Sequence, residues 1–298
     1  MPDQTSLYRA LFRIRRFEEI VLEKFPTGVF RGTTHTYLGQ EANAVGVLAH
    51  RQEGDIVFSN HRCHGHFLAY GGDSRALFAE LMGKATGVCG GRGGSQHLHW
   101  RNFYSNGVLG STAPVATGTA LAEKLKGARA ATILFLGDGA FGEGVVYESL
   151  NMAALWGAPI LFVVENNHIA QTTPLAQHLA GDFVARFAAF GIPVRELDTS
   201  DVTLILPEAE AALGAVYRGE GPQGLVLHTC RFGPHSKGDD TRPAEVLKHM
   251  RQARDPLAIH GTRLEPAIRD EIEKQVQKEV EAAFNQAVAD PYPESTIQ

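Results

Sequence analysis

The sequence predicts an α/β fold built on a doubly wound, mostly parallel sheet, with helical extensions at both ends. Two continuous apolar runs, residues 131–136 and 159–164, are typical of buried parallel strands. A glycine-rich turn and a helical stretch at residues 145–156 lie between the runs, so together they form a strand–helix–strand unit. Apolar stretches at residues 55–59 and 225–229 would add strands to the same sheet.

The chain before this unit is predicted to be largely helical. Apolar residues recur at steps of three and four over residues 7–25, which indicates an amphipathic helix. The segments that follow are expected to be a loop at 28–39, a helix at 40–50, the strand at 55–59, a histidine-rich stretch at 60–66, a helix at 75–82, a glycine-rich segment at 83–94 and irregular chain at 95–110.

The chain after the unit is predicted to end in helices. We expect a helix at residues 183–190, a polar loop at 231–242 and charged helices without strands beyond it. Because no repeat or linker divides the sequence, we expect a single domain over residues 1–298. Within it, residues 1–39 would form an N-terminal helix and loop, and residues 243–298 a helical C-terminal extension.

Charge and composition exclude several classes of protein. Lysine and arginine total 28 and aspartate and glutamate 33, which gives a formal charge of −5 and no basic excess for nucleic acid. No run approaches the roughly 18 apolar residues of a membrane-spanning helix, so we expect no membrane partner. The three cysteines are scattered and form no disulfide framework, which favours a cytoplasmic location.

The turn between the two buried strands carries the expected chemistry. Gly137, Gly139 and Gly142 follow the Gly-x-Gly-x-x-Gly spacing of dinucleotide-binding turns, so a nicotinamide-binding oxidoreductase is one alternative. Asp138 argues against it, because its carboxylate would repel a pyrophosphate at that place unless a divalent cation lay between them. With a metal present, Asp138 becomes a ligand, and the N–H groups of Gly139 and Ala140 face the phosphates.

Asn167 is the second expected metal ligand. It follows the neighbouring strand, 29 residues after Asp138 (167 − 138 = 29). Adjacent parallel strands end side by side, at the crevice where open α/β sheets bind ligands. The two side-chain oxygens, a backbone carbonyl just beyond, water and two phosphate oxygens would complete the octahedral shell of Mg²⁺.

These residues and several further motifs resemble a known family. Gly137-Asp138-Gly139 followed by Asn166-Asn167 is similar to the thiamine-diphosphate motif. Residues 148–156 and 165–167 resemble the alpha subunit of heterotetrameric 2-oxo acid dehydrogenases, a family that includes pyruvate, branched-chain and acetoin dehydrogenases. The resemblance runs from about residue 7 to 290 and implies the thiamine-diphosphate-binding fold; it is also carried by residues 39–42, 62–65, 90–95 and 235–236.

The resemblance implies roles for individual residues. Asp138, Asn167 and the backbone carbonyl of Ile169 would bind Mg²⁺. His64 and His235 match the two active-site histidines of the family, and we expect them to act in catalysis. The complete set of expected cofactor contacts is His61, Arg62, Gly107, Leu109, Asp138, Gly139, Ala140, Asn167, Ile169, Arg231 and His235.

One alternative for the histidine-rich stretch stays open at this point. His61, His64 and His66 together offer three nitrogen ligands, which could instead form a zinc site. The spacing is not a strong zinc pattern, and no pair of cysteines accompanies it.

The resemblance also implies an activity and partners. The chain would bind thiamine diphosphate and Mg²⁺ and assist oxidative decarboxylation of a 2-oxo acid, with acyl transfer to lipoamide. In the family, the glutamate that activates the aminopyrimidine belongs to a beta subunit. We therefore expect an α2β2 heterotetramer, inactive without the beta subunit, and a lipoyl-bearing acyltransferase core as a further partner. A transketolase-like or acyloin-forming thiamine-diphosphate transferase is the alternative that keeps the same cofactor.

Overall fold

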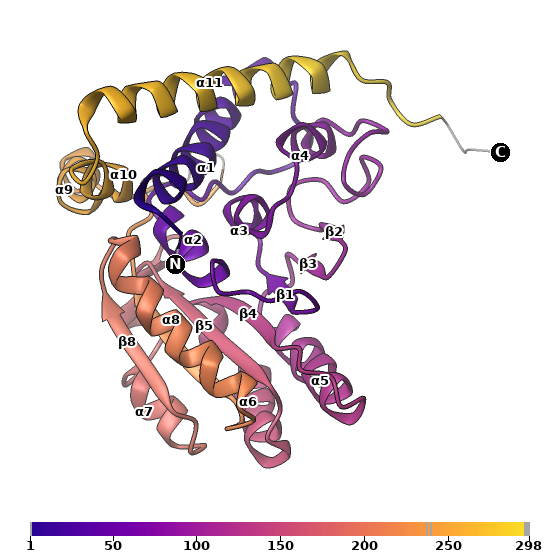
Figure 1. Cartoon of the computed structure of the whole chain (residues 1–298), viewed down its shortest axis with the longest axis vertical. Coiled ribbons are helices and arrows are strands. Elements are labelled where there is room, and N and C mark those ends of the chain that lie inside the picture. The colour runs from indigo at the N-terminus through magenta and orange to yellow at the C-terminus, as the bar shows by residue number, and fades with distance from the viewer. Residues whose placement is uncertain (1, 237, 239, 295–298) are drawn as a thin grey trace.

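A mostly parallel sheet forms the centre of the molecule (Figure 1). The computed structural model describes residues 2–236, 238 and 240–294. The seven strands lie in the order β2-β3-β1-β4-β5-β9-β8, and only the β2–β3 pair is antiparallel. Their bounds are β1 (Ile56–Ser59), β2 (His99–Trp100), β3 (Phe103–Ser105), β4 (Thr132–Gly137), β5 (Ile160–Asn166), β8 (Val194–Asp198) and β9 (Gln223–His228).

Helices cover both faces of this sheet, which confirms the predicted doubly wound α/β fold. In β5, Leu161 and Val163 belong to one core, whereas Ile160 and Phe162 belong to the other, because successive side chains of a strand point to opposite faces. The second core is closed by α5 (Thr112–Leu125), α6 (Gly144–Trp156) and α7 (Phe183–Ala188). The first is closed by α1 (Gln4–Lys24), α2 (Glu41–Leu48), α3 (Cys63–Tyr70), α4 (Ser74–Leu81), α8 (Val202–Tyr217), α10 (Pro256–Gly261) and α11 (Pro266–Ala289).

The two ends of the chain pack together on the first face. Figure 1 shows α11 running across α1 and α4, and these helices share one apolar core. The Asp3 side chain caps α1 by accepting a hydrogen bond from the Ser6 backbone N–H at 2.9 Å. Before α10, the chain forms the exposed helix α9 (Ala244–Arg254). Residues 1 and 295–298 of the predicted extensions, and residues 237 and 239 of the predicted polar loop, lie outside the described residues.

Several elements were not expected from the sequence. The predicted helix and strand bounds around the central unit are close to those observed, but α5, α8 and β8 received no prediction, and the irregular stretch at 95–110 contains β2 and β3. The buried face of α5 consists of small residues such as Ala116 and Ala120, which give a weak periodic signal. Helix α8 contains Pro207, a residue that normally argues against a helix interior.

Among the described residues, no helix combines the length and the apolar character needed to span a bilayer.

Candidate active site

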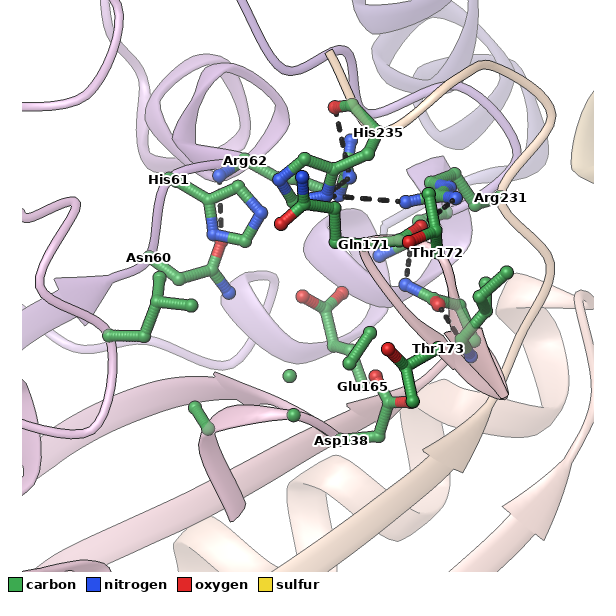
Figure 2. Close-up of a pocket in the computed structure, with 18 of the residues that line it drawn as sticks. Asn60, His61, Arg62, Asp138, Glu165, Gln171, Thr172, Thr173, Arg231 and His235 are labelled. Carbon is green, nitrogen blue, oxygen red and sulfur yellow. Dashed lines mark hydrogen bonds between the residues drawn. The ribbon is translucent and has the colours of Figure 1, made fainter. Parts of the chain in front are cut away.

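A cavity of about 350 Å³ lies where β4 and β5 end, beside the small hairpin of β6 (Ile169–Ala170) and β7 (Thr173–Pro174). Figure 2 shows Asp138 and Glu165 on one side of this cavity, and Arg62, His235 and Arg231 on the opposite side. Its lining residues are Gln40, Asn60, His61, Arg62, Leu109, Gly137, Asp138, Gly139, Ala140, Glu143, Glu165, Asn167, Ile169, Ala170, Gln171, Thr172, Thr173, Arg231 and His235.

Asp138 brings a buried carboxylate to the cavity. It directly follows β4 and is only 2% exposed. Its Oδ2 atom has no hydrogen-bond partner among the described residues, and the nearest basic atom recorded for it is Nε2 of His178 at 3.6 Å. Burial raises the pKa of Asp138 above its ordinary value, although His178 and backbone N–H groups oppose the shift. An ionised carboxylate oxygen without a partner is a ready ligand for a cation.

Asn167 lies beside Asp138, as the strand order requires. Gly137 of β4 pairs with Glu165 of β5, so the residues that follow the two strands are neighbours. The Asn167 side chain donates to Gln40 Oε1 at 3.3 Å and accepts from the Ile169 N–H, also at 3.3 Å.

The hairpin after β5 has a constrained backbone. His168 and Gln171, on either side of β6, have positive φ values of 65° and 52°. Non-glycine residues rarely adopt this left-handed conformation, and it recurs at ligand-binding sites. The Ile169–Ala170 backbone lies between these two residues and runs along the cavity wall, where both residues line the cavity.

Gly139 has a steric role in the turn. A Cβ atom at this position would lie 2.8 Å from the Ala170 Cβ, which is closer than such atoms approach. Glycine therefore lets the turn after β4 pack against the hairpin. Ala140 opens the short helix η2 (Ala140–Gly142) and also lines the cavity.

Two buried arginines form the opposite wall. Arg62 is 4% exposed and donates to the Thr36 carbonyl at 3.0 Å and to the His235 Nδ1 at 3.0 Å. Arg231 is 1% exposed and donates to the Gln171 carbonyl at 3.1 Å. Their guanidinium groups are permanent positive charges with planar sets of donors, which suit phosphate or carboxylate oxygens.

Three histidine rings gather beside the arginines. The His35 ring lies 4.7 Å from that of His61 and 4.8 Å from that of His235, and we call these three residues the histidine cluster. Burial lowers the pKa of His61 well below its ordinary value, and the positive charge of Arg62 adds to this. Their ring nitrogens are close enough to hold a metal ion, but Arg62 and Arg231 lie beside them, so this wall favours an anion.

The structure does not bring His64 into the cavity. His64 lies in the first turn of α3 and is fully buried. Its Nδ1 pairs with Glu18 Oε2 at 3.1 Å and its Nε2 with Ser95 Oγ at 2.9 Å. Both ring nitrogens are therefore engaged away from the cavity, and this geometry lends no support to the expected catalytic role.

The zinc alternative for the histidine-rich stretch finds no support either. His66 pairs with Ser59 Oγ at 2.8 Å and with Glu165, whereas His64 pairs with Glu18 and Ser95. His64 and His66 lie two positions apart on α3 and point in different directions, and among the described residues His61 groups with His35 and His235 instead.

Of the expected cofactor contacts Gly107 and Leu109, Leu109 lines the cavity, whereas Gly107 is not among the lining residues. A Cβ atom on Gly107 would lie 2.1 Å from Gln96 Oε1, so a side chain at this position would displace the end of the Gln96 side chain.

Glu165 is a site residue that the sequence analysis did not assign. It is 2% exposed and lines the cavity. It accepts hydrogen bonds from the Tyr37 hydroxyl and, at 3.0 Å, from the Asn43 amide, and it pairs with His66 Nε2 at 3.3 Å. Burial opposes its ionisation, but His66 and these donors outweigh burial and lower its pKa. The sequence contained a signal for this role, because Glu165 is a charged residue at the end of an apolar buried strand, and a buried charge needs partners.

Comparison with known proteins identifies the family. The dehydrogenase E1 component family matches residues 9–296. The chain is 36% identical to the alpha subunit of acetoin:2,6-dichlorophenolindophenol oxidoreductase from Bacillus subtilis, over 97% of this chain and 90% of that protein. It is 38% identical to the pyruvate dehydrogenase E1 component subunit alpha of Rhizobium meliloti, over 93% and 82%. The corresponding Zymomonas mobilis subunit is 39% identical, over 85% and 73%. The chain therefore belongs to the dehydrogenase E1 component family, the thiamine-diphosphate-dependent 2-oxo acid dehydrogenases, and is of the alpha-subunit type.

Proposed function

We propose that the cavity binds the diphosphate end of thiamine diphosphate together with Mg²⁺, and that the chain assists oxidative decarboxylation of a 2-oxo acid. The observation that carries this proposal is the separation of charge across the cavity. A buried carboxylate oxygen, Oδ2 of Asp138, has no hydrogen-bond partner among the described residues, and the buried guanidinium groups of Arg62 and Arg231 line the other wall. A metal ion bound to an anion matches this arrangement, because each charge would face its opposite.

The donor set fits a hard cation. In this proposal the Asp138 carboxylate, the Asn167 amide oxygen and the Ile169 carbonyl hold Mg²⁺, which prefers oxygen ligands and six-fold coordination. All three residues line the cavity. The backbone N–H groups of Gly139 and Ala140, at the start of a helical turn, are suited to the phosphates.

The opposite wall would hold the diphosphate. Arg62 and Arg231 supply permanent positive charge, and His61 can donate a hydrogen bond to an anion. Gly107 and Leu109 would support the aminopyrimidine ring. When bound, thiamine diphosphate supplies a carbon nucleophile for the keto carbon and a sink for the electrons left when carbon dioxide departs.

His235 is the proposed proton donor and acceptor. Its Nδ1 accepts a hydrogen bond from Arg62 at 3.0 Å, so the proton of the neutral ring lies on Nε2. The ring is thereby held in one tautomer and one orientation. In this proposal Nε2 is the atom that exchanges a proton with a substrate in the cavity.

The proposed assembly includes a beta subunit. Relatives of this chain are named as alpha subunits, which implies a second kind of subunit. We propose an α2β2 heterotetramer in the cytoplasm, in which the beta subunit provides the glutamate for the aminopyrimidine, and a lipoyl-bearing acyltransferase core that receives the acyl group. In this assembly residues 1–298 act as one diphosphate-binding domain, braced by the extensions at 1–39 and 243–298.

A second function deserves its own test. Two of the relatives named above act in pyruvate dehydrogenases, but another is an acetoin oxidoreductase subunit. A thiamine-diphosphate enzyme that cleaves or forms acyloins would use the same cavity.

One experiment separates the two functions. The chain, co-expressed with its beta subunit, should reduce an artificial electron acceptor with a 2-oxo acid, and only in the presence of Mg²⁺ and thiamine diphosphate. If the complex reduced the acceptor with acetoin but with none of a panel of 2-oxo acids, the acyloin-cleaving or acyloin-forming function would be established instead.

A further inference from the structure

Glu80 is a buried carboxylate that the proposed chemistry does not use. It lies near the end of α4 and is fully buried. Its Oε2 accepts hydrogen bonds from the N–H groups of Cys89 at 2.6 Å and Gly91 at 2.9 Å. Its Oε1 accepts from Gly93 at 2.7 Å and Gly94 at 3.1 Å. One carboxylate thus satisfies four backbone donors of the glycine-rich segment, and bonds of this kind to a charged acceptor are strong.

The glycines permit this arrangement. A Cβ atom on Gly87 would lie 2.4 Å from Glu80 Oε2, and one on Gly93 would lie 2.0 Å from the His97 carbonyl oxygen. The base of the segment is held from another side, because Lys84 Nζ donates to the Val288 carbonyl at 3.0 Å. The segment is therefore not a loose loop but a backbone wrapped around one buried anion, in the manner of an anion-binding nest.

Ser95 and Gln96 follow the glycine-rich segment and connect it to residues near the cavity. Ser95 Oγ pairs with His64 Nε2 at 2.9 Å, which ties the segment to α3. The Gln96 amide nitrogen lies 3.2 Å from His35 Nδ1, and its oxygen packs against Gly107. His35 in turn contacts the other two rings of the histidine cluster edge-on. Contacts thus run without a break from Glu80, through Gln96, to the proposed cofactor site.

We propose that Glu80 and Gln96 are positioning residues for this site: Glu80 fixes the shape of the glycine-rich segment, and Gln96 orients His35 within the histidine cluster. The inference rests on the proposed function, because it assigns these residues to the cavity proposed to hold the diphosphate. Donation from the Gln96 amide to Nδ1 places the proton of the neutral His35 ring on Nε2. His64, through Ser95, then belongs to the same support and not to the reacting groups.

Two variants separate the two steps. Glu80→Gln keeps the size of the side chain but replaces one acceptor oxygen by an N–H group that faces backbone donors. Gln96→Leu is close in size and removes the amide that donates to His35, together with the oxygen that packs against Gly107. Glu53→Gln is the matched control, because it makes the same chemical change as Glu80→Gln at an exposed residue in a turn. Each full chain is measured alone by amide hydrogen exchange and melting temperature, and in complex with its beta subunit by thiamine diphosphate titration and turnover.

For Glu80→Gln, we expect amides 89–94 to exchange at least about tenfold faster, and cofactor affinity to fall about tenfold, consistent with loss of hydrogen bonds to a charged group. For Gln96→Leu, exchange and melting temperature should match the wild type, while turnover falls about tenfold and its pH profile shifts, because the His35 tautomer is no longer fixed. Glu53→Gln should match the wild type throughout.

If amides 89–94 of Glu80→Gln exchanged at the wild-type rate, the proposed role of Glu80 would be refuted. Wild-type affinity, turnover and pH profile in Gln96→Leu would refute the role of Gln96, and this variant decides the inference if Glu80→Gln fails to fold. Failure of the wild-type complex to bind Mg²⁺ and thiamine diphosphate would instead overturn the proposed function, and with it the site that these residues are proposed to support.

Discussion

Replacement of Asp138 by asparagine should have opposite effects on stability and on cofactor binding. The change keeps the shape of the side chain and removes its charge. Burial raises the pKa of Asp138, so folding favours the protonated carboxyl. A group whose pKa is raised by folding contributes stability at low pH that is lost as the pH rises through the folded value. Above that value the ionised carboxylate costs folding free energy, and asparagine removes this cost from the cofactor-free chain.

Cofactor binding should respond in the other direction. The Asp138 carboxylate would be the charged protein ligand of Mg²⁺, and two unit charges about 4 Å apart interact by about 4 kcal/mol at an effective dielectric constant near 20. Because asparagine keeps an oxygen ligand, we expect a loss of about 3–4 kcal/mol, or roughly 10²–10³-fold in the dissociation constant of the Mg²⁺–cofactor pair. The loss should appear only when the cation is present.

Differential scanning fluorimetry at pH 7 tests both effects in one experiment. The cofactor-free Asp138→Asn chain should melt above the wild type, whereas Mg²⁺ with thiamine diphosphate should raise the melting temperature of the wild-type complex only. Asp270→Asn, an exposed change on α11, is the control and should behave as the wild type. A cofactor-dependent shift of normal size in Asp138→Asn would refute the metal assignment, and a lower melting temperature of the cofactor-free variant would refute the electrostatic argument.

Four further substitutions test other parts of the site. Arg62→Ala should weaken cofactor binding by about 1.5–3 kcal/mol, the scale of hydrogen bonds to charged groups, as measured by calorimetry. His235→Ala should fold normally and lower turnover of the assembled complex by roughly 10²–10⁴-fold; undiminished turnover would exclude it from proton transfer. His64→Ala should mainly lower the midpoint of urea unfolding, because Glu18 loses its buried partner at a cost of about 1–3 kcal/mol. A large loss of turnover at unchanged stability would instead support a catalytic role for His64. Gly139→Ala should cost about 1–3 kcal/mol in unfolding free energy, because its methyl group would crowd Ala170.

The central unit of the fold could be predicted because its signals are local. The apolar runs that became β4 and β5 are buried on both faces of a parallel sheet, so they read as continuous apolar sequence. Helix α5 could not be predicted in the same way, because its buried face consists of alanines and threonines, which give little periodic apolar signal. The short strand β3 depends on its pairing with β1, a contact distant in sequence.

The same distinction holds at the candidate site. Asp138 and Asn167 could be placed together from the sequence because each directly follows a strand of one unit. The role of His64 could not be judged, because it depends on Glu18 of α1 and on Ser95, which are far from it in sequence. His35 was missed for a similar reason, since only the folded chain brings it against His61 and His235.

The electrostatics of the cavity tie stability to function. His66, Tyr37 and Asn43 favour the ionised form of Glu165 and lower its pKa, so this carboxylate already has partners within the protein. Asp138 has no such set of partners: burial raises its pKa, and its Oδ2 accepts no hydrogen bond among the described residues. Of two buried acids in one cavity, the chain therefore stabilises one and leaves the other to be stabilised by a ligand. In the proposed function, a cation at Asp138 would relieve this cost on binding, so part of the binding free energy would come from an unfavourable feature of the free chain. This is why, of these two acids, we assign Asp138 to the metal.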